Sequence, residues 1–144
     1  MVSEYFRKLD EEKHPDYRGG FEPIPDVVVF RPGIGGDFRR RNRENTLRQM
    51  LVAVEVKASE RHQGRLRGSE IVKDIVKLEA LGIEARHRGS DVLGAVVVID
   101  TALEENERMT PEARRATEAA ARGREVCLFY VSPTQESVIL PDVL

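Results

Sequence analysis

The feature that most restricts the fold of this chain is the order of its apolar segments. Short runs rich in β-branched residues alternate with longer segments whose apolar residues recur at helical spacing. The short runs predict strands at residues 27–30, 51–57, 94–101 and 125–131. Strands and helices that alternate in this way predict an α/β layer, with parallel crossovers and one antiparallel hairpin between the first two strands.

Two of the segments that follow strands have the periodicity and the end signals of helices. Apolar residues recur at helical spacing in residues 69–81, and Gly82 is the expected end of that helix. A second helix is predicted for residues 111–123, with Thr110 as its cap and a proline at its first position. A short N-terminal helix is also predicted at residues 3–9.

Length and composition place the chain in one broad class. Its 144 residues correspond to one domain, so residues 1–144 are interpreted as a single unit. The longest uninterrupted apolar run, residues 95–99, is far shorter than the ~20 residues that span a bilayer, and no secretory signal is visible. The single cysteine, Cys127, excludes an internal disulfide and favours a reducing compartment. We therefore expect a cytoplasmic protein with no membrane partner.

Two acidic residues and a lysine lie at the ends of the first two predicted strands. Asp26 comes directly before the first strand, and Glu55 and Lys57 close the second. Because side chains alternate along a strand, Glu55 and Lys57 point to the same face. If the two strands form an antiparallel hairpin, Asp26 lies beside both of them. Two converging carboxylates repel each other unless a cation lies between them, and oxygen ligands suit Mg²⁺ or Mn²⁺.

A lysine beside such a cation has three roles open to it in phosphodiester hydrolysis. Lys57 can orient a water molecule, stabilise developing negative charge, or act as a base if its pKa is lowered. A divalent ion that activates water in line with a phosphorus atom provides the remaining chemistry. The pattern therefore predicts Asp26, Glu55 and Lys57 as the catalytic group.

These residues, in this order, resemble a known family. Pro25-Asp26, an apolar strand, a loop and a second apolar strand that ends in Glu55-Val56-Lys57 look like the PD-(D/E)XK nuclease superfamily, and in particular its small stand-alone bacterial members. The resemblance continues through the helix at 69–81 and the strand at 94–101, so that it covers residues 22–101. A second Pro-Asp pair, at 141–142, has no matching strand after it and is interpreted as a chance match.

The resemblance implies a fold and a set of site residues. The fold is restriction-endonuclease-like, with three layers, a mixed central sheet, an antiparallel catalytic hairpin and helices on both faces. Asp26 and Glu55 are implied as ligands of a divalent metal, and Lys57 as the residue that assists the attacking water. Many members add a glutamate from the opening helix; Glu4 is the candidate here. The strand that members usually have before the Pro-Asp strand is weak or absent in residues 17–24, which contain Gly19-Gly20.

Basic residues are concentrated in the middle of the chain. Residues 31–88 hold 14 Lys and Arg against 8 Asp and Glu, although the net charge of the whole chain is −2. A local basic segment suits contact with a polyanion, and a solvated surface loop is the alternative interpretation. The predicted nucleic-acid contacts are four arginines of the loop at 32–49 and one lysine of the helix at 69–81, namely Arg39, Arg40, Arg41, Arg43 and Lys73.

Two functions from different classes follow from the sequence. The first is a Mg²⁺- or Mn²⁺-dependent endonuclease that hydrolyses phosphodiester bonds of nucleic acid, with DNA as the expected substrate. The second is a non-catalytic nucleic-acid-binding or assembly module that retains the nuclease fold. A homodimer and a place in a larger multidomain complex both stay open as partner arrangements.

Overall fold

A computed structural model of the chain describes residues 25–33, 44–59 and 65–142. These residues have the α/β architecture that the sequence predicts, and the helix predicted at residues 3–9 lies outside them. No helix in the described part is both long and apolar enough to cross a membrane. The elements, in chain order, are β1 (Val27–Phe30), α2 (Glu44–Gln49), β2 (Met50–Ser59), α3 (Gly68–His87), β3 (Leu93–Asp100), the 3-10 helix η1 (Glu105–Glu107), α4 (Pro111–Gly123), β4 (Cys127–Val131) and β5 (Glu136–Ile139).

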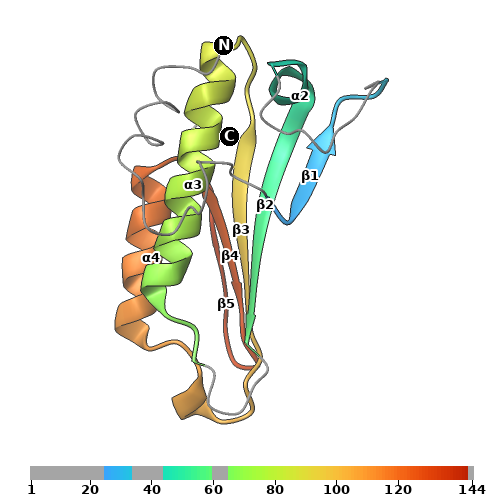
Figure 1. The fold of residues 1–144 in the computed structure, drawn as a ribbon. Coiled ribbons are helices and arrows are strands. Elements are labelled where there is room, and N and C mark those ends of the chain that lie inside the picture. The colour runs from blue at the N-terminus through green and yellow to red at the C-terminus, as the bar shows by residue number, and fades with distance from the viewer. Residues whose placement is uncertain (1–24, 34–43, 60–64, 143–144) are drawn as a thin grey trace, which may run out of the picture.

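The strands form a five-stranded mixed sheet in the order β1-β2-β3-β4-β5 (Figure 1). β1 and β2 pair in antiparallel orientation, as expected for the hairpin, and Val27 lies opposite Val54. β2, β3 and β4 are parallel, and α3 and α4 make the two crossovers between them. The predicted hairpin and the predicted parallel crossovers are therefore confirmed.

Both long helices pack against the same face of this sheet, side by side (Figure 1). Two successive crossovers of the same hand, made in the same direction across a sheet, place their helices on one face. The strand residues on this face are buried and form the core with α3 and α4; among them are Ala53, Val96 and Leu128. The described helices thus form two layers with the sheet, and helices on both faces are not seen within these residues.

The opposite face of the sheet is apolar along several strands. Val27 and Val29 of β1 alternate with the core residues of that strand, and their side chains are exposed. Val56, Val131 and Val138 continue this exposed row on β2, β4 and β5. A sheet face in contact with water usually carries polar side chains, whereas this face carries exposed valines.

α3 is longer than the predicted helix, which was expected to end at Gly82. The structure continues the helix to His87, because Leu81 and Ala85 still face the core and are buried. Gly89 follows the C-cap residue Arg88, and its φ of +78° is readily adopted by glycine. Ser90 N donates to Ala85 O at 2.9 Å and Gly89 N donates to Arg86 O at 3.0 Å, which is the bond pattern of a Schellman motif.

α4 follows its sequence signals closely, whereas two short elements lack such signals. The Thr110 hydroxyl accepts a hydrogen bond from Ala113 N at 3.2 Å, so the predicted cap is formed. α2 falls inside the segment expected to be a loop, and its six residues are too few to show a helical period. β5 is a four-residue edge strand with a single buried residue, Ile139, so it has no clear alternating pattern.

Gly94 determines how closely α3 approaches β3. A Cβ atom at this position would lie 3.0 Å from Leu78 Cβ, so a larger residue pushes α3 away from the sheet. We expect Gly94→Val to lower the free energy of unfolding by about 1–3 kcal/mol. Gly123→Val is the matched control, since no atom lies within 4 Å of the added Cβ there. Urea unfolding of both variants measures the difference; an equal effect at the two glycines would contradict the tight contact.

Candidate functional site

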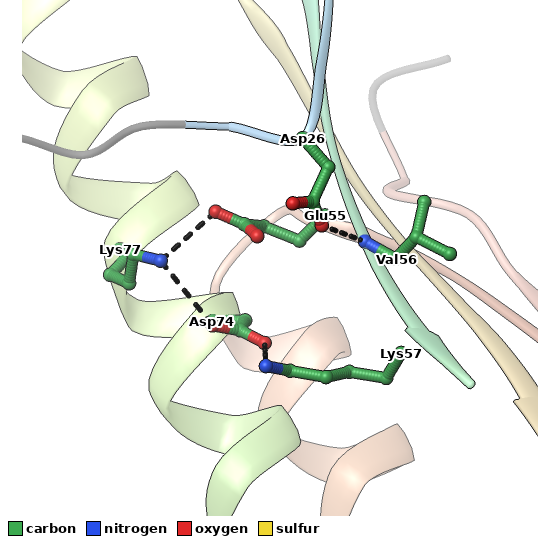
Figure 2. Close-up of polar contacts among 6 residues, drawn as sticks. All are labelled: Asp26, Glu55, Val56, Lys57, Asp74 and Lys77. Atoms are coloured by element: carbon green, nitrogen blue, oxygen red, sulfur yellow. Dashed lines mark hydrogen bonds and ion pairs between the residues drawn. The ribbon is translucent and has the colours of Figure 1, made fainter. Parts of the chain in front are cut away.

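The β1–β2 hairpin brings Asp26 next to the end of β2. Asp26 directly precedes β1, and the pairing of Val27 with Val54 sets it near Glu55. Its Oδ2 accepts a hydrogen bond of 2.7 Å from Val56 N, which fixes the carboxylate against the backbone of β2 (Figure 2). The structure thus brings together two residues that are far apart in the sequence, in the orientation that the hairpin argument requires.

Glu55 lies on the core face of β2, and only 4% of its surface is exposed. Its Oε1 accepts a hydrogen bond of 3.0 Å from Lys77 Nζ on α3. Burial, together with the negative charges of Asp74 and Asp26, raises the pKa of Glu55 above its ordinary value, and the contact with Lys77 only partly offsets this. Glu55 is therefore a carboxylate whose charged form would gain from an additional cation.

Lys57 projects from β2 toward α3 rather than toward Asp26 (Figure 2). Its Nζ lies 3.1 Å from Asp74 Oδ2, and 35% of the Lys57 side chain stays exposed. Asp74 is buried, with only 7% of its side chain exposed, and its Oδ1 accepts a 3.4 Å hydrogen bond from Lys77 Nζ. The two lysines and three carboxylates form a row along the β2–α3 contact, from Lys57 through Asp74, Lys77 and Glu55 to Asp26.

Lys77 lies between two carboxylates in this row. Burial disfavours its positive charge, but the hydrogen bond to Glu55 and the charges of Glu55 and Asp74 together outweigh burial and raise the pKa of Lys77. The amine therefore carries its charge throughout the neutral range. Lys77 is therefore a counter-ion shared by the buried carboxylates of Glu55 and Asp74.

Asp74 and Lys77 are the two site residues that the sequence reasoning did not place. From the sequence, Lys77 shares a helix face with Lys73, which suits either a phosphate contact or a solvated face paired with Asp74. A usable signal is nevertheless present, because Asp74 interrupts the apolar stripe formed by Ile71, Ile75 and Leu78 on α3. A charged residue at a core position of a helix needs a buried partner, and such a position points to a polar site.

The other predicted site residues divide into two groups. Lys73 is on α3 with an exposed side chain, on the surface of the helix that carries Asp74 and Lys77. The remaining ones lie outside the residues that the structure describes; they are the candidate third ligand Glu4 and the loop arginines Arg39, Arg40, Arg41 and Arg43.

The described residues offer two carboxylates, Asp26 and Glu55, to a metal ion. Within residues 25–33, 44–59 and 65–142, no group of three or more His, Cys, Asp or Glu side chains is arranged to hold a metal. The remaining oxygens, Asp26 Oδ1 and Glu55 Oε2, accept no hydrogen bond from the residues that the structure describes. A hard ion that keeps several waters needs only one or two protein carboxylates, so the donor set suits Mg²⁺.

The raised pKa of Glu55 has a consequence for the stability of the metal-free protein. A carboxyl whose pKa is higher in the folded state adds stability below its unfolded pKa, and that stability is lost as pH rises through the folded value. We expect Glu55→Gln to become more stable relative to the wild type as pH rises above about 4.3, the ordinary pKa of a glutamate. Urea unfolding in the presence of a chelator measures this. A pH-independent difference between the two proteins would contradict a raised pKa of Glu55 in the folded state.

Comparisons of the chain with protein-family models, with curated protein sequences and with solved structures find no match. The geometry of Asp26, Glu55 and their neighbours on α3 is therefore the basis for any functional assignment.

Proposed function

We propose that this protein is a divalent-metal-dependent nuclease that hydrolyses phosphodiester bonds, with DNA as its substrate. The observation that carries the proposal is the convergence of the Asp26 and Glu55 carboxylates from two strands, with Lys57 on the same face of β2. Burying a glutamate beside an aspartate is unfavourable, and an ordinary surface hairpin does not require it. A buried carboxyl with a raised pKa, such as that of Glu55, is typical of functional sites.

Asp26 and Glu55 are the proposed ligands of Mg²⁺ or Mn²⁺. Glu55 is buried, and the charge of Asp26 contributes to the rise of its pKa, so the pair is short of positive charge despite Lys77. A bound divalent ion supplies Lewis-acid activation of water and neutralises charge on the phosphate. The hydrogen bond from Val56 N holds Asp26 in the orientation in which its other oxygen faces away from the strand.

Lys57 is proposed to act on the phosphate or on the attacking water. Its ammonium is anchored near Asp74, yet a third of its side chain is exposed, so it can reach a bound substrate. A lysine at this place stabilises negative charge as the phosphorus is attacked. Lys73 is exposed on α3, the helix that carries Asp74. It is a proposed contact to the nucleic-acid backbone, together with Arg39, Arg40, Arg41 and Arg43.

We propose further that the fold belongs with the PD-(D/E)XK, restriction-endonuclease-like arrangement. The antiparallel β1–β2 hairpin, the α3 crossover and the parallel β3 occur in the order that the resemblance implies. β4 and β5 extend the sheet beyond that core.

The test is a cleavage assay with the purified full chain on supercoiled plasmid, linear duplex and single-stranded DNA. We expect cleavage with Mg²⁺ or Mn²⁺ and none with EDTA, and we expect Glu55→Gln to be inactive with every substrate. RNA is included as a fourth substrate. Cleavage that persists in EDTA or in the Glu55→Gln variant, or no cleavage of any substrate, would reject the proposal.

A non-catalytic assembly module is the second candidate, and one observation favours it. The exposed valines of the sheet face, among them Val29 and Val138, form an apolar surface suited to a second copy of the chain. Light scattering of the wild type and of a Val29→Lys/Val138→Lys variant tests this. A dimer that the two lysines dissociate supports the module, and a wild-type monomer rejects this form of it.

A further inference from the structure

We propose that Asp74 is a positioning residue for Lys57. A residue of α3 would then determine where the ammonium of Lys57, on β2, lies. This inference rests on the proposed nuclease function and adds to it a residue outside the Asp26, Glu55 and Lys57 group. Its basis is the contact between Lys57 Nζ and Asp74 Oδ2, at 3.1 Å, across the β2–α3 boundary.

The contact restrains the Lys57 ammonium at the β2–α3 boundary. Asp74 Oδ2 is buried and accepts no hydrogen bond, although the ammonium of Lys57 is within ion-pair distance. Among the described residues, no other partner contacts Lys57 Nζ. An ammonium has three N–H donors, so those not directed at Asp74 stay available to solvent or to a substrate. Asp74 thus limits where Lys57 can go while leaving it able to donate.

Asp74 is itself held from the other side. Its Oδ1 accepts from Lys77 Nζ at 3.4 Å, and the same ammonium donates to Glu55 Oε1 at 3.0 Å. Lys77 therefore ties the carboxylate that positions Lys57 to one of the proposed metal ligands. A change that displaces α3 alters the lysine and the glutamate together.

The distance between the two charged residues on β2 is similar to the distance between the two charged residues on α3. Glu55 and Lys57 are two residues apart on a strand, which separates them by about 6.7 Å on one face. Asp74 and Lys77 are three residues apart on a helix, where such neighbours have Cβ atoms about 5–6 Å apart. Lys57 therefore pairs with Asp74, and Glu55 pairs with Lys77. Ion pairs that involve a buried carboxylate are weak contributors to stability, so stability alone does not account for these two pairs.

The test compares Asp74→Asn, Lys57→Met and the double variant in the DNA-cleavage assay. Asp74→Asn keeps the shape of the side chain and removes its charge. We expect kcat to fall about 10–100-fold, as for partners that orient a functional group, with KM and Mg²⁺ affinity within about twofold of wild type. In the Lys57→Met background, Asp74→Asn should cause no further loss, because the aspartate acts through the lysine. Asp74→Glu, which keeps the charge, should restore part of the lost rate.

The matched control is Glu79→Gln on the same helix. Glu79 pairs with Arg124 at 3.7 Å and takes no part in the row of site residues, so cleavage should be unchanged. Two results would overturn the proposal. One is a double variant whose kcat falls by the product of the two single-variant losses, and the other is a wild-type kcat in Asp74→Asn. Thermal unfolding of each variant identifies loss of rate through loss of fold.

A measurement without DNA or metal separates this inference from the nuclease proposal. NMR relaxation of the Lys57 side chain, with ¹³C at its Cε, reports how far the ammonium is restrained. We expect a restrained Lys57 in the wild type and in Glu79→Gln, and a mobile one in Asp74→Asn. Equal mobility in all three overturns the positioning role even in an active enzyme. A restrained lysine in a wild type that cleaves no nucleic acid overturns the nuclease function instead.

Discussion

Asp26→Asn is expected to lower the rate of DNA cleavage by more than about 100-fold, beyond the 10–100-fold range found when a residue behind a metal ligand is removed. Asparagine keeps an oxygen that can accept the hydrogen bond from Val56 N, so the hairpin is preserved. What is lost is the negative charge beside Glu55, which the proposed divalent ion needs. Cleavage of plasmid DNA under saturating Mg²⁺ measures the effect.

The chain contains its own control for this substitution. Asp142 also follows a proline, and its side chain is exposed, but it lies after β5 and away from β2. Asp142→Asn should cleave DNA at the wild-type rate. Equal losses in the two variants, or full activity of Asp26→Asn, would show that Asp26 is not part of the active site.

Leu78→Ala is expected to lower the free energy of unfolding by about 2–5 kcal/mol. Only 3% of the surface of Leu78 is exposed, and it fills the contact between α3 and Gly94 of β3. Such a loss is a large share of the 5–15 kcal/mol by which a domain of this kind is stable. Leu103→Ala is the same truncation at a residue that is 90% exposed, and should change stability by less than about 0.5 kcal/mol.

Urea denaturation of the two alanine variants gives both values in one experiment. Similar midpoints for Leu78→Ala and Leu103→Ala would mean that α3 is not packed on the sheet as described. Because Asp74 and Lys77 lie within one turn of Leu78 on α3, this packing also determines whether the row of charges across the β2–α3 contact forms.

The sequence predicts the main elements because their signals are local. The β-branched runs of β1 and β3 and the cap and proline of α4 need no knowledge of the rest of the chain. The end of α3 is different, since the sequence predicts a stop at Gly82, which lies inside the helix. Tertiary burial of Leu81 and Ala85 extends that helix past Gly82, and no local signal before Gly89 contradicts it.

The candidate site was predictable in part for the same reason. Alternation along β2 puts Glu55 and Lys57 on one face, and hairpin pairing adds Asp26. The direction in which a long side chain turns depends on what packs above it, so the partner of Lys57 had to come from the structure. Asp74 and Lys77 are neighbours of β2 only because the crossover places α3 over that strand.

The central claim is that Asp26 and Glu55 together bind a divalent cation. A crystal of the full chain soaked in Mn²⁺ tests it most directly, since manganese is located by its anomalous scattering. We expect one peak between the Asp26 and Glu55 carboxylates, and no peak there in crystals of Asp26→Asn. Manganese bound elsewhere in the molecule, with no peak between these two carboxylates, would contradict it.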